Sequence, residues 1–327
     1  MAASAWTTDE LLASIRAQGR LLDEDPDATD AILLAEATRQ LYRVFVPAIR
    51  AARADYYLTS EDIPLVTGQV GYAIPARSST SSVRKVMIVD SAGREDELDP
   101  IPVGDSHLYQ GSNGQPCVYT IQDDRILLRP APARADTLRV LYEYRPAELA
   151  LRAACAQITA ISRAPIFGVD NVLFEIDAKP AAFVAGFVLD AIRGGSPFSL
   201  RFTDAAIGAV SVSDDISWLE STDDYAEVNG ADTAVGDFLC PAGTSCIPQI
   251  PVELHPALAL ATAAQYLLPT DPGLASTLKA DALASLTDQL ALLAPRQQGR
   301  QMKLRNQTSF MRRGARRRRG GFSDWTP

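Results

Sequence analysis

The chain has 327 residues, 47% of them hydrophobic, and a formal net charge of −9. A chain of this length and composition can bury a sizeable core, which excludes an intrinsically disordered protein. It has no run of about 18 apolar residues and no basic, apolar leader at its start, so we expect a soluble protein made in a cytoplasm, with no membrane contact.

The charge is divided unevenly along the chain. From Arg300 to Pro327 nine Lys or Arg stand against one Asp, a balance of +8, which leaves −17 for residues 1–299. Because each neutralised phosphate requires a cation, the acidic part is not expected to bind nucleic acid over its general surface. Any contact with nucleic acid would be made by the basic tail.

Two helices are predicted in the first 55 residues. The first covers residues 7–22, where Thr7 and Glu10 have the spacing of a capping box. Its apolar face is formed by Leu11, Ile15 and Leu22. The second covers residues 30–53, and its helical stripe consists of Leu34, Thr38, Leu41, Phe45 and Ile49.

Residues 56–150 change to a strand pattern. The stretch "SVRKVMIVD" is typical of a strand that ends at a turn, and "PCVYTIQDDRILLRP" predicts a hairpin that turns at Asp123-Asp124. The strand "TLRVLYEYRP" alternates and places Leu138, Val140, Tyr142 and Tyr144 on one face. We therefore expect a small antiparallel β-domain.

Residues 151–250 contain further short apolar pieces, such as "AQITAIS", "NVLFEID" and "DISWLES", separated by Gly, Pro, Asp and Ser. Short strands at these intervals predict a second compact barrel or sandwich and argue against a parallel α/β sheet. The stretch "CIPQIPVELHP" is interpreted as a proline-punctuated linker.

Two more helices follow. The first begins near Pro256, ends before Pro269, and has the predicted stripe Leu258, Ala261, Ala264 and Leu268. The second runs from Asp271-Pro272 to Pro295, with the stripe Leu283, Leu286, Leu290 and Leu293.

The predicted fold class is α+β. The N- and C-terminal helices would form an antiparallel bundle, because amphipathic stripes need one another, and the small antiparallel β-sandwich or barrel domains would be inserted between them. The expected division is residues 1–55 (helices), 56–150 (first β-domain), 151–250 (second β-insertion), 251–296 (helices) and 297–327, an extended Arg-rich arm.

Catalytic and metal-binding patterns are not found in the sequence. His107 and His255 lack the spacing of a metal motif, and Gly194-Gly195-Ser196 fits a turn better than a phosphate loop. The acidic pairs Asp214-Asp215 and Asp223-Asp224 fit solvated turns. The cysteines are interpreted as reduced structural thiols: Cys117, Cys155, Cys240 and Cys246. We expect no enzyme activity, cofactor or metal.

Two stretches carry a resemblance to a known family. They are "RILLRPAPARADTLRVLYEYRP" and "IPQIPVELHPALALATAAQYLLPTDPGLASTLKADALASLTDQLALLAPR", which precedes a ragged basic end. Together with the N-terminal helices they resemble the head-to-tail adaptor (connector) proteins of tailed bacteriophages over about two thirds of the chain.

This resemblance implies a structural protein of the virion neck. It implies a ring of identical subunits, twelve being the expected number, that joins the portal protein to tail components such as a nozzle or tail-tube protein and lines the DNA exit channel. It also implies that the C-terminal segment extends to the portal and binds it.

The portal-binding candidates combine arginines, which grip carboxylates through a planar fork, with aromatic anchors of the kind enriched at interface hot spots. They are Arg300, Lys303, Arg305, Phe310, Arg312, Arg313, Arg316, Arg317, Arg318, Arg319, Phe322 and Trp325. Two alternatives stay open: a solvated, disordered end, and contact of the tail with genomic double-stranded DNA. The second alternative corresponds to a DNA-associated protein that binds phosphates through this tail.

Overall fold

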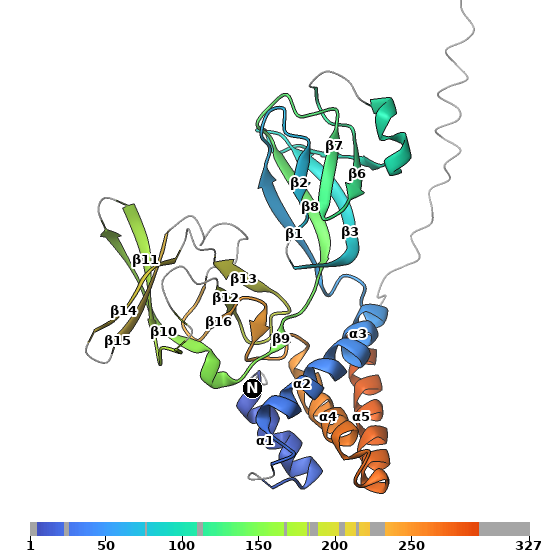
Figure 1. Ribbon diagram of the computed structural model, residues 1–327, viewed down its shortest axis with the longest axis vertical. Coiled ribbons are helices and arrows are strands. Elements are labelled where there is room, and N and C mark those ends of the chain that lie inside the picture. The colour runs from blue at the N-terminus through green and yellow to red at the C-terminus, as the bar shows by residue number, and fades with distance from the viewer. Residues whose placement is uncertain are drawn as a thin grey trace, which may run out of the picture. The chain divides into compact units, whose positions relative to one another are not determined.

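The computed structural model describes residues 5–22, 26–75, 77–109, 114–166, 169–181, 183, 189–202, 207–213, 216–222 and 233–293. The chain up to Leu293 forms one compact unit. Its described residues contain five α-helices and several sheets whose strands pair mainly antiparallel, which confirms the α+β class (Figure 1). Within these residues no sheet closes into a barrel.

Helix α1 covers Thr8–Gly19 and begins with the predicted capping box. The Glu10 N–H donates to the Thr7 hydroxyl, and the Thr7 N–H donates to the Glu10 carboxylate at 2.7 Å. Leu11 and Ile15 are fully buried, as predicted. The placement of Leu22 on the same face is wrong, because the helix ends at Gly19 and this side chain is 77% exposed beyond it.

The second predicted helix is three consecutive helical segments: α2 (Asp30–Gln40), a π-helical turn (Leu41–Phe45) and α3 (Val46–Ala52). The Val46 N–H donates to the Leu41 carbonyl, which is the wide spacing of a π turn. A proline inside a helix lacks an N–H and clashes with the carbonyl four residues earlier. We attribute the wide turn to Pro47, which follows it directly.

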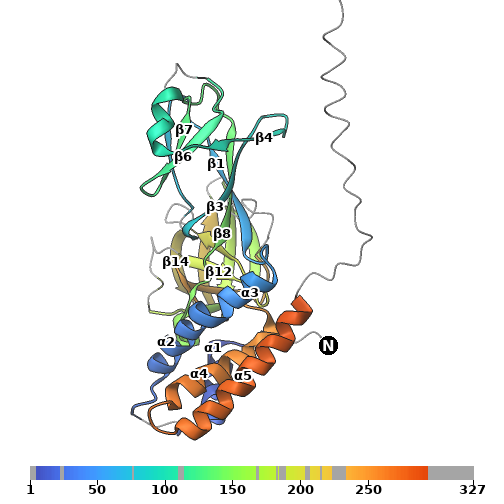
Figure 2. The same ribbon diagram turned by 90° about the vertical axis from the view of Figure 1, so that its right-hand side faces the viewer.

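The C-terminal helices are α4 (His255–Leu267) and α5 (Pro272–Leu293), which pack against each other as a hairpin (Figure 2). Helix α4 also contacts α1 and α2, and α5 contacts α3. None of the described helices is long and apolar enough to cross a bilayer.

The apolar faces of these two helices differ from the predicted stripes. In α4 the predicted Leu258 and Ala264 are buried, but the last member of the stripe is wrong, because Leu267 is buried and Leu268 is exposed. The buried side chains of α5 are Ala275, Leu278, Ala282 and Leu286, so only Leu286 of the predicted stripe is buried. Leu290 and Leu293 are partly buried and pack against the core, whereas Leu283 is 48% exposed.

The first β-region contains two four-stranded sheets. One has the order β1 (Leu58–Pro64), β8 (Thr137–Tyr144), β3 (Ser78–Val89) and β4 (Glu95–Glu97). The other has the order β2 (Gly71–Ala73), β7 (Arg125–Arg129), β6 (Val118–Gln122) and β5 (Asp99–Pro100). Every second residue of β8 is buried, and the β6–β7 hairpin turns at Asp123-Asp124, with φ 46° at Asp123. Both predictions are confirmed.

The second β-region is a seven-stranded sheet, ordered β13 (Ser199–Phe202), β12 (Leu189–Ile192), β16 (Phe238–Pro241), β10 (Ala156–Ile166), β11 (Val169–Ile176), β15 (Ile216–Thr222) and β14 (Ile207–Ser213). Gly194-Gly195 forms the predicted turn between β12 and β13, and φ at Gly195 is +82°, which favours glycine. The pairs Asp214-Asp215 and Asp223-Asp224 lie outside the described residues.

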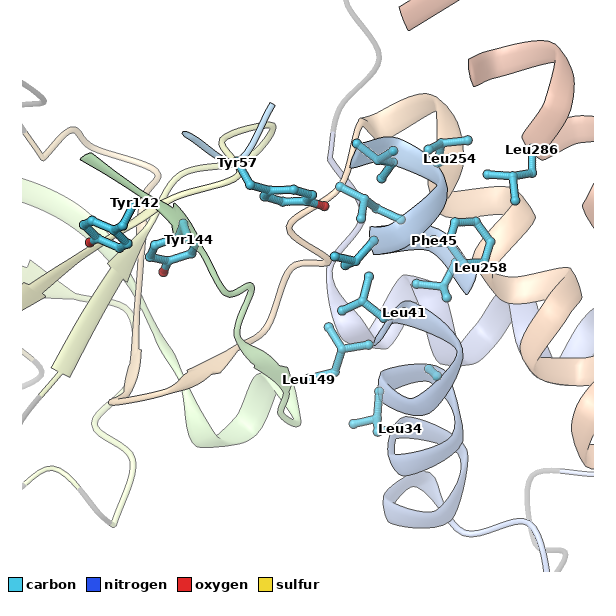
Figure 3. Close-up of a cluster of buried hydrophobic side chains, with 14 of the residues drawn as sticks. Leu34, Leu41, Phe45, Tyr57, Tyr142, Tyr144, Leu149, Leu254, Leu258 and Leu286 are labelled. Carbon is cyan, nitrogen blue, oxygen red and sulfur yellow. The ribbon is translucent and has the colours of Figure 1, made fainter. Parts of the chain in front are cut away.

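One hydrophobic core joins the helices to the first β-region (Figure 3). Leucines of α2, α4 and α5 pack in the same cluster as Tyr57 before β1 and Leu149 after β8. The predicted linker contributes to it, since Ile250 and Leu254 are fully buried. The linker interpretation is therefore wrong: the prolines shape a core segment that leads into α4.

A short crossing segment, residues 144–150, is bonded to many parts of the chain. It runs from the end of β8 through β9 (Glu148–Leu149), which pairs in parallel with β17 (Thr244–Ser245). The amides of its six non-proline residues donate, in order, to the Tyr57 carbonyl (2.8 Å), Arg77 carbonyl (2.8 Å), Gln249 Oε1 (2.6 Å), Gly243 carbonyl (3.0 Å), Thr38 hydroxyl (3.2 Å) and Ser245 carbonyl (2.9 Å).

The buried face of α5 can be tested by shortening one buried and one exposed leucine of this helix. Leu278→Ala should lower the free energy of unfolding by about 2–4 kcal/mol, because it leaves a cavity in the core. Leu283→Ala, at a side chain that is 48% exposed, should lower it by less than about 1 kcal/mol. Urea unfolding of both variants, followed by circular dichroism, measures the difference. The opposite order would support the stripe read from the sequence.

Candidate docking surfaces

The twelve predicted portal-binding residues all belong to the stretch 300–327, which lies outside the described residues. The structure therefore describes the folded body that precedes this stretch in the chain, up to Leu293. The portal-binding assignment of these residues stays a prediction, based on their charge and aromatic content.

A first exposed surface is the 3-10 helix η2, Val103–Tyr109, which packs beside β6 and buries none of its own residues. Val103, Leu108 and Tyr109 are exposed there, Leu108 by 69%. Three large apolar side chains on one exposed turn are a typical feature of a protein interaction site. Sequence reasoning did not identify it, although the spacing of these residues was a visible signal.

A second exposed surface is an apolar groove on the helices. It has a volume of about 250 Å³ and is lined by Gln40, Val44, Phe45, Ala261, Ala264, Gln265, Leu268, Ala275, Ser276, Lys279, Ala282, Leu283 and Leu286. Leu268 and Leu283, which were predicted to be buried, lie at this groove with about half of their surface exposed. The groove can accept apolar side chains of a partner.

Ten arginines among the described residues of the folded body form ion pairs with carboxylates. Arg139 grips Asp62 with two hydrogen bonds of 2.7 Å and also pairs with Glu95. The arginines with such a partner are Arg16, Arg39, Arg50, Arg53, Arg77, Arg84, Arg94, Arg139, Arg152 and Arg193. A phosphate would have to displace these partners, so the pairing disfavours nucleic acid binding by the body.

One ion pair lies where the two β-regions meet. Arg77, which precedes β3, pairs at 2.9 Å with Asp190 of β12, whose side chain is almost completely buried. Asp190 also accepts the Gly243 N–H at 2.8 Å, and the guanidinium lies over the Tyr144 ring. A buried pair with additional hydrogen bonds of this kind fixes geometry, because removing either partner leaves an uncompensated buried charge.

The two histidines occupy structural positions. His255 is fully buried at the start of α4, where its Nδ1 accepts the Trp6 N–H at 3.1 Å and its Nε2 faces the Ile250 carbonyl. Burial lowers its pKa from the ordinary value of 6.5. His107 lies exposed in η2, with Nδ1 2.7 Å from the Gly104 carbonyl. The two rings thus belong to different elements, and both contact backbone groups.

Three of the four free cysteines converge, which sequence reasoning missed: Cys155, Cys240 and Cys246. Hydrogen bonds from Cys240 and Cys246, with the nearby Arg152 charge, lower the pKa of the Cys155 thiol to about 5. Burial raises the pKa of the Cys240 thiol. A turn around Gly243 was a weak sequence signal that Cys240 and Cys246 approach each other, whereas nothing in the sequence pointed to Cys155.

Comparison with known proteins identifies a family. The sequence profile of the SU10 adaptor protein family matches residues 6–188, which is more than half of the chain and includes α1 to α3 and the first β-region. No curated protein matches the chain.

The position of His255 predicts how stability depends on pH. Below its ordinary pKa of 6.5 the unfolded chain takes up a proton that the buried ring resists, so the free energy of unfolding falls as the pH drops from 7 to 5. The slope from this group is at most about 1.4 kcal/mol per pH unit. His255→Asn, which keeps an acceptor for the Trp6 amide, should flatten the profile measured by denaturant unfolding. Equal slopes in both proteins would contradict the assignment.

Proposed function

The chain belongs to the SU10 adaptor protein family, a family of phage head-to-tail adaptors, and from this premise we propose that its copies assemble into a ring between portal and tail. The family is a structural one, and it is associated with portal and tail components in the neck of the virion. In the proposal, twelve copies surround the channel through which DNA leaves the capsid.

The observation that carries the proposal for this chain is its divided charge. The portion up to residue 299 has a balance of −17 and the remainder has +8. Many arginines of the body, such as Arg77 and Arg139, form ion pairs with carboxylates, whereas the arm has nine cations and one acid. A cationic arm on an acidic body suits a subunit that attaches to an acidic surface of another protein.

The arm is suited to the portal by length and chemistry. Residues 297–327, when extended at about 3.3–3.6 Å per residue, can reach on the order of 100 Å. Arginine binds carboxylates bidentately and keeps its charge when partly buried, and Phe310, Phe322 and Trp325 supply apolar anchors. We therefore assign the arm to the portal, with contact to genomic DNA as the alternative.

Ring closure needs two different faces on each copy, because its contacts are head to tail. The two exposed apolar surfaces of the described residues, η2 and the α4–α5 groove, lie on different elements and are our candidates for these faces. The acidic bodies repel one another in solution. This repulsion fits a subunit that stays monomeric until a portal ring brings copies together.

The arm is tested by truncation after Gln298. The shortened chain should lose most of its affinity for purified portal rings, while its unfolding curve stays unchanged because the folded unit ends before the cut. An unchanged affinity for portal rings would contradict the assignment of the arm to the portal.

A matched variant identifies the chemistry of the arm. Replacement of the six arginines between residues 312 and 319 by lysine keeps the charge and removes the fork, so portal binding should weaken about tenfold or more. Binding of the arm to DNA would instead survive the exchange. The logarithm of its association constant would fall linearly with the logarithm of the salt concentration. Electron microscopy of portal mixtures shows whether rings form and where they sit.

The ring faces are tested with charged substitutions. Leu108→Asp in η2 and Leu283→Asp at the groove should each prevent ring formation on portal, because an unpaired carboxylate in an apolar contact is costly. Leu22→Asp, at an exposed side chain that is part of neither surface, is the control and should assemble normally. Mass photometry with and without portal gives the readout, and normal rings in both test variants would rule out these faces.

A further inference from the structure

The three converging thiols form a compact cluster from distant parts of the chain. Cys155 precedes β10, Cys240 lies in β16, and Cys246 follows β17. Their sulfur atoms all lie within 4.8 Å of one another, and the Cys240 and Cys246 sulfurs are 3.7 Å apart. All three residues are at most 1% exposed.

The backbone holds each cysteine in place. The Cys155 carbonyl accepts a 2.7 Å hydrogen bond from Arg152, and the Cys246 carbonyl accepts one of 2.7 Å from the Thr8 N–H at the start of α1. Ser245, itself fully buried, accepts the Ile247 N–H at 3.0 Å and so fixes the turn next to Cys246. The sulfurs are therefore positioned by several elements before any ligand binds.

The spacing fits a metal better than a disulfide. A disulfide requires sulfurs about 2.05 Å apart, which is far shorter than the 3.7 Å between Cys240 and Cys246. In a tetrahedral zinc site with Zn–S bonds of about 2.3 Å, neighbouring sulfurs are about 3.8 Å apart. The remaining sulfur is close enough to complete one triangular face of such a tetrahedron with a small side-chain rotation.

A buried residue bonded to the backbone of the cluster provides a further observation. Thr8, which is fully buried and bonded through its amide to the Cys246 carbonyl, has a side-chain oxygen with no hydrogen-bond partner among the described residues. Buried polar groups normally have a partner, which is often an ordered water. A water bound close to Thr8 would supply one.

We propose that Cys155, Cys240 and Cys246 bind one thiophilic divalent cation, zinc, with water as the fourth ligand. Binding as three thiolates releases the thiol protons to solvent and gives a trithiolate complex with a charge of −1, close to the Arg152 guanidinium. The metal would join the second β-region to the segment that leads into α4, so its role is structural. It is independent of the ring assembly proposed above.

The experiment uses the full-length chain, purified without chelator. We expect one zinc per chain by elemental analysis, and exchange for cobalt should give the thiolate-to-cobalt charge-transfer absorption and the visible bands of a tetrahedral site. Cys240→Ser and Cys246→Ser should lose the metal and these bands. Cys117→Ser, at the exposed fourth cysteine, is the matched control and should keep both.

A second measurement covers variants that fail to fold. In the wild-type chain, removal of zinc by chelation should lower the melting temperature, and stoichiometric zinc should restore it by mass action. Wild-type protein that takes up no stoichiometric zinc or cobalt would overturn the proposal. A Cys240–Cys246 disulfide found by mass spectrometry in protein kept under reducing conditions would also overturn it.

Discussion

The structure depends on the hydrogen bonding of one short crossing segment, residues 144–150. Each of its backbone amides is bonded to a different part of the chain, from Thr38 in α2 to Ser245 in β17. Because a buried amide without a partner costs free energy, these bonds constrain the helices and both β-regions to a single mutual arrangement. The Arg77–Asp190 pair adds a second constraint at the same place, since Arg77 also bonds to the Arg145 carbonyl.

Around this crossing the hydrophobic core is continuous, and its continuity explains how the chain combines helices with inserted strands. Tyr57 and Leu149 belong to the strand side but pack against leucines of α2 and α4. The segment that the prolines of residues 248–256 suggested to be a linker is part of this core. The helices and the first β-region therefore share one buried core, while η2 stays exposed outside it.

The folded body and the C-terminal arm carry opposite net charges. In the folded part many arginines form ion pairs, as Arg139 does with Asp62, and a net acidic charge remains. The charged residues of the arm are nine cations and one acid. This division agrees with the proposed assembly, in which acidic bodies repel one another and the basic arm binds a neighbour.

Sequence patterns were reliable where local chemistry decides the outcome. The capping box at Thr7, the hairpin turn at Asp123-Asp124 and the alternation of β8 all appear as predicted, because they depend on residues close in the chain. Sequence patterns failed where the buried face of a helix depends on the element that packs against it. The buried face of α5 is set by its contact with α4, so Leu278 is buried and Leu283 is exposed.

The sequence by itself determined the α+β class, the starts of the four predicted helices, the divided charge and the resemblance to phage adaptors, since all of these are properties of neighbouring residues or of composition. Only the tertiary structure brought together Cys155, Cys240 and Cys246, paired Arg77 with Asp190, and turned a proline-rich stretch into core. Such convergences join residues far apart in the chain. They are decided by how the buried surfaces of several elements pack at once, which a one-dimensional pattern does not encode.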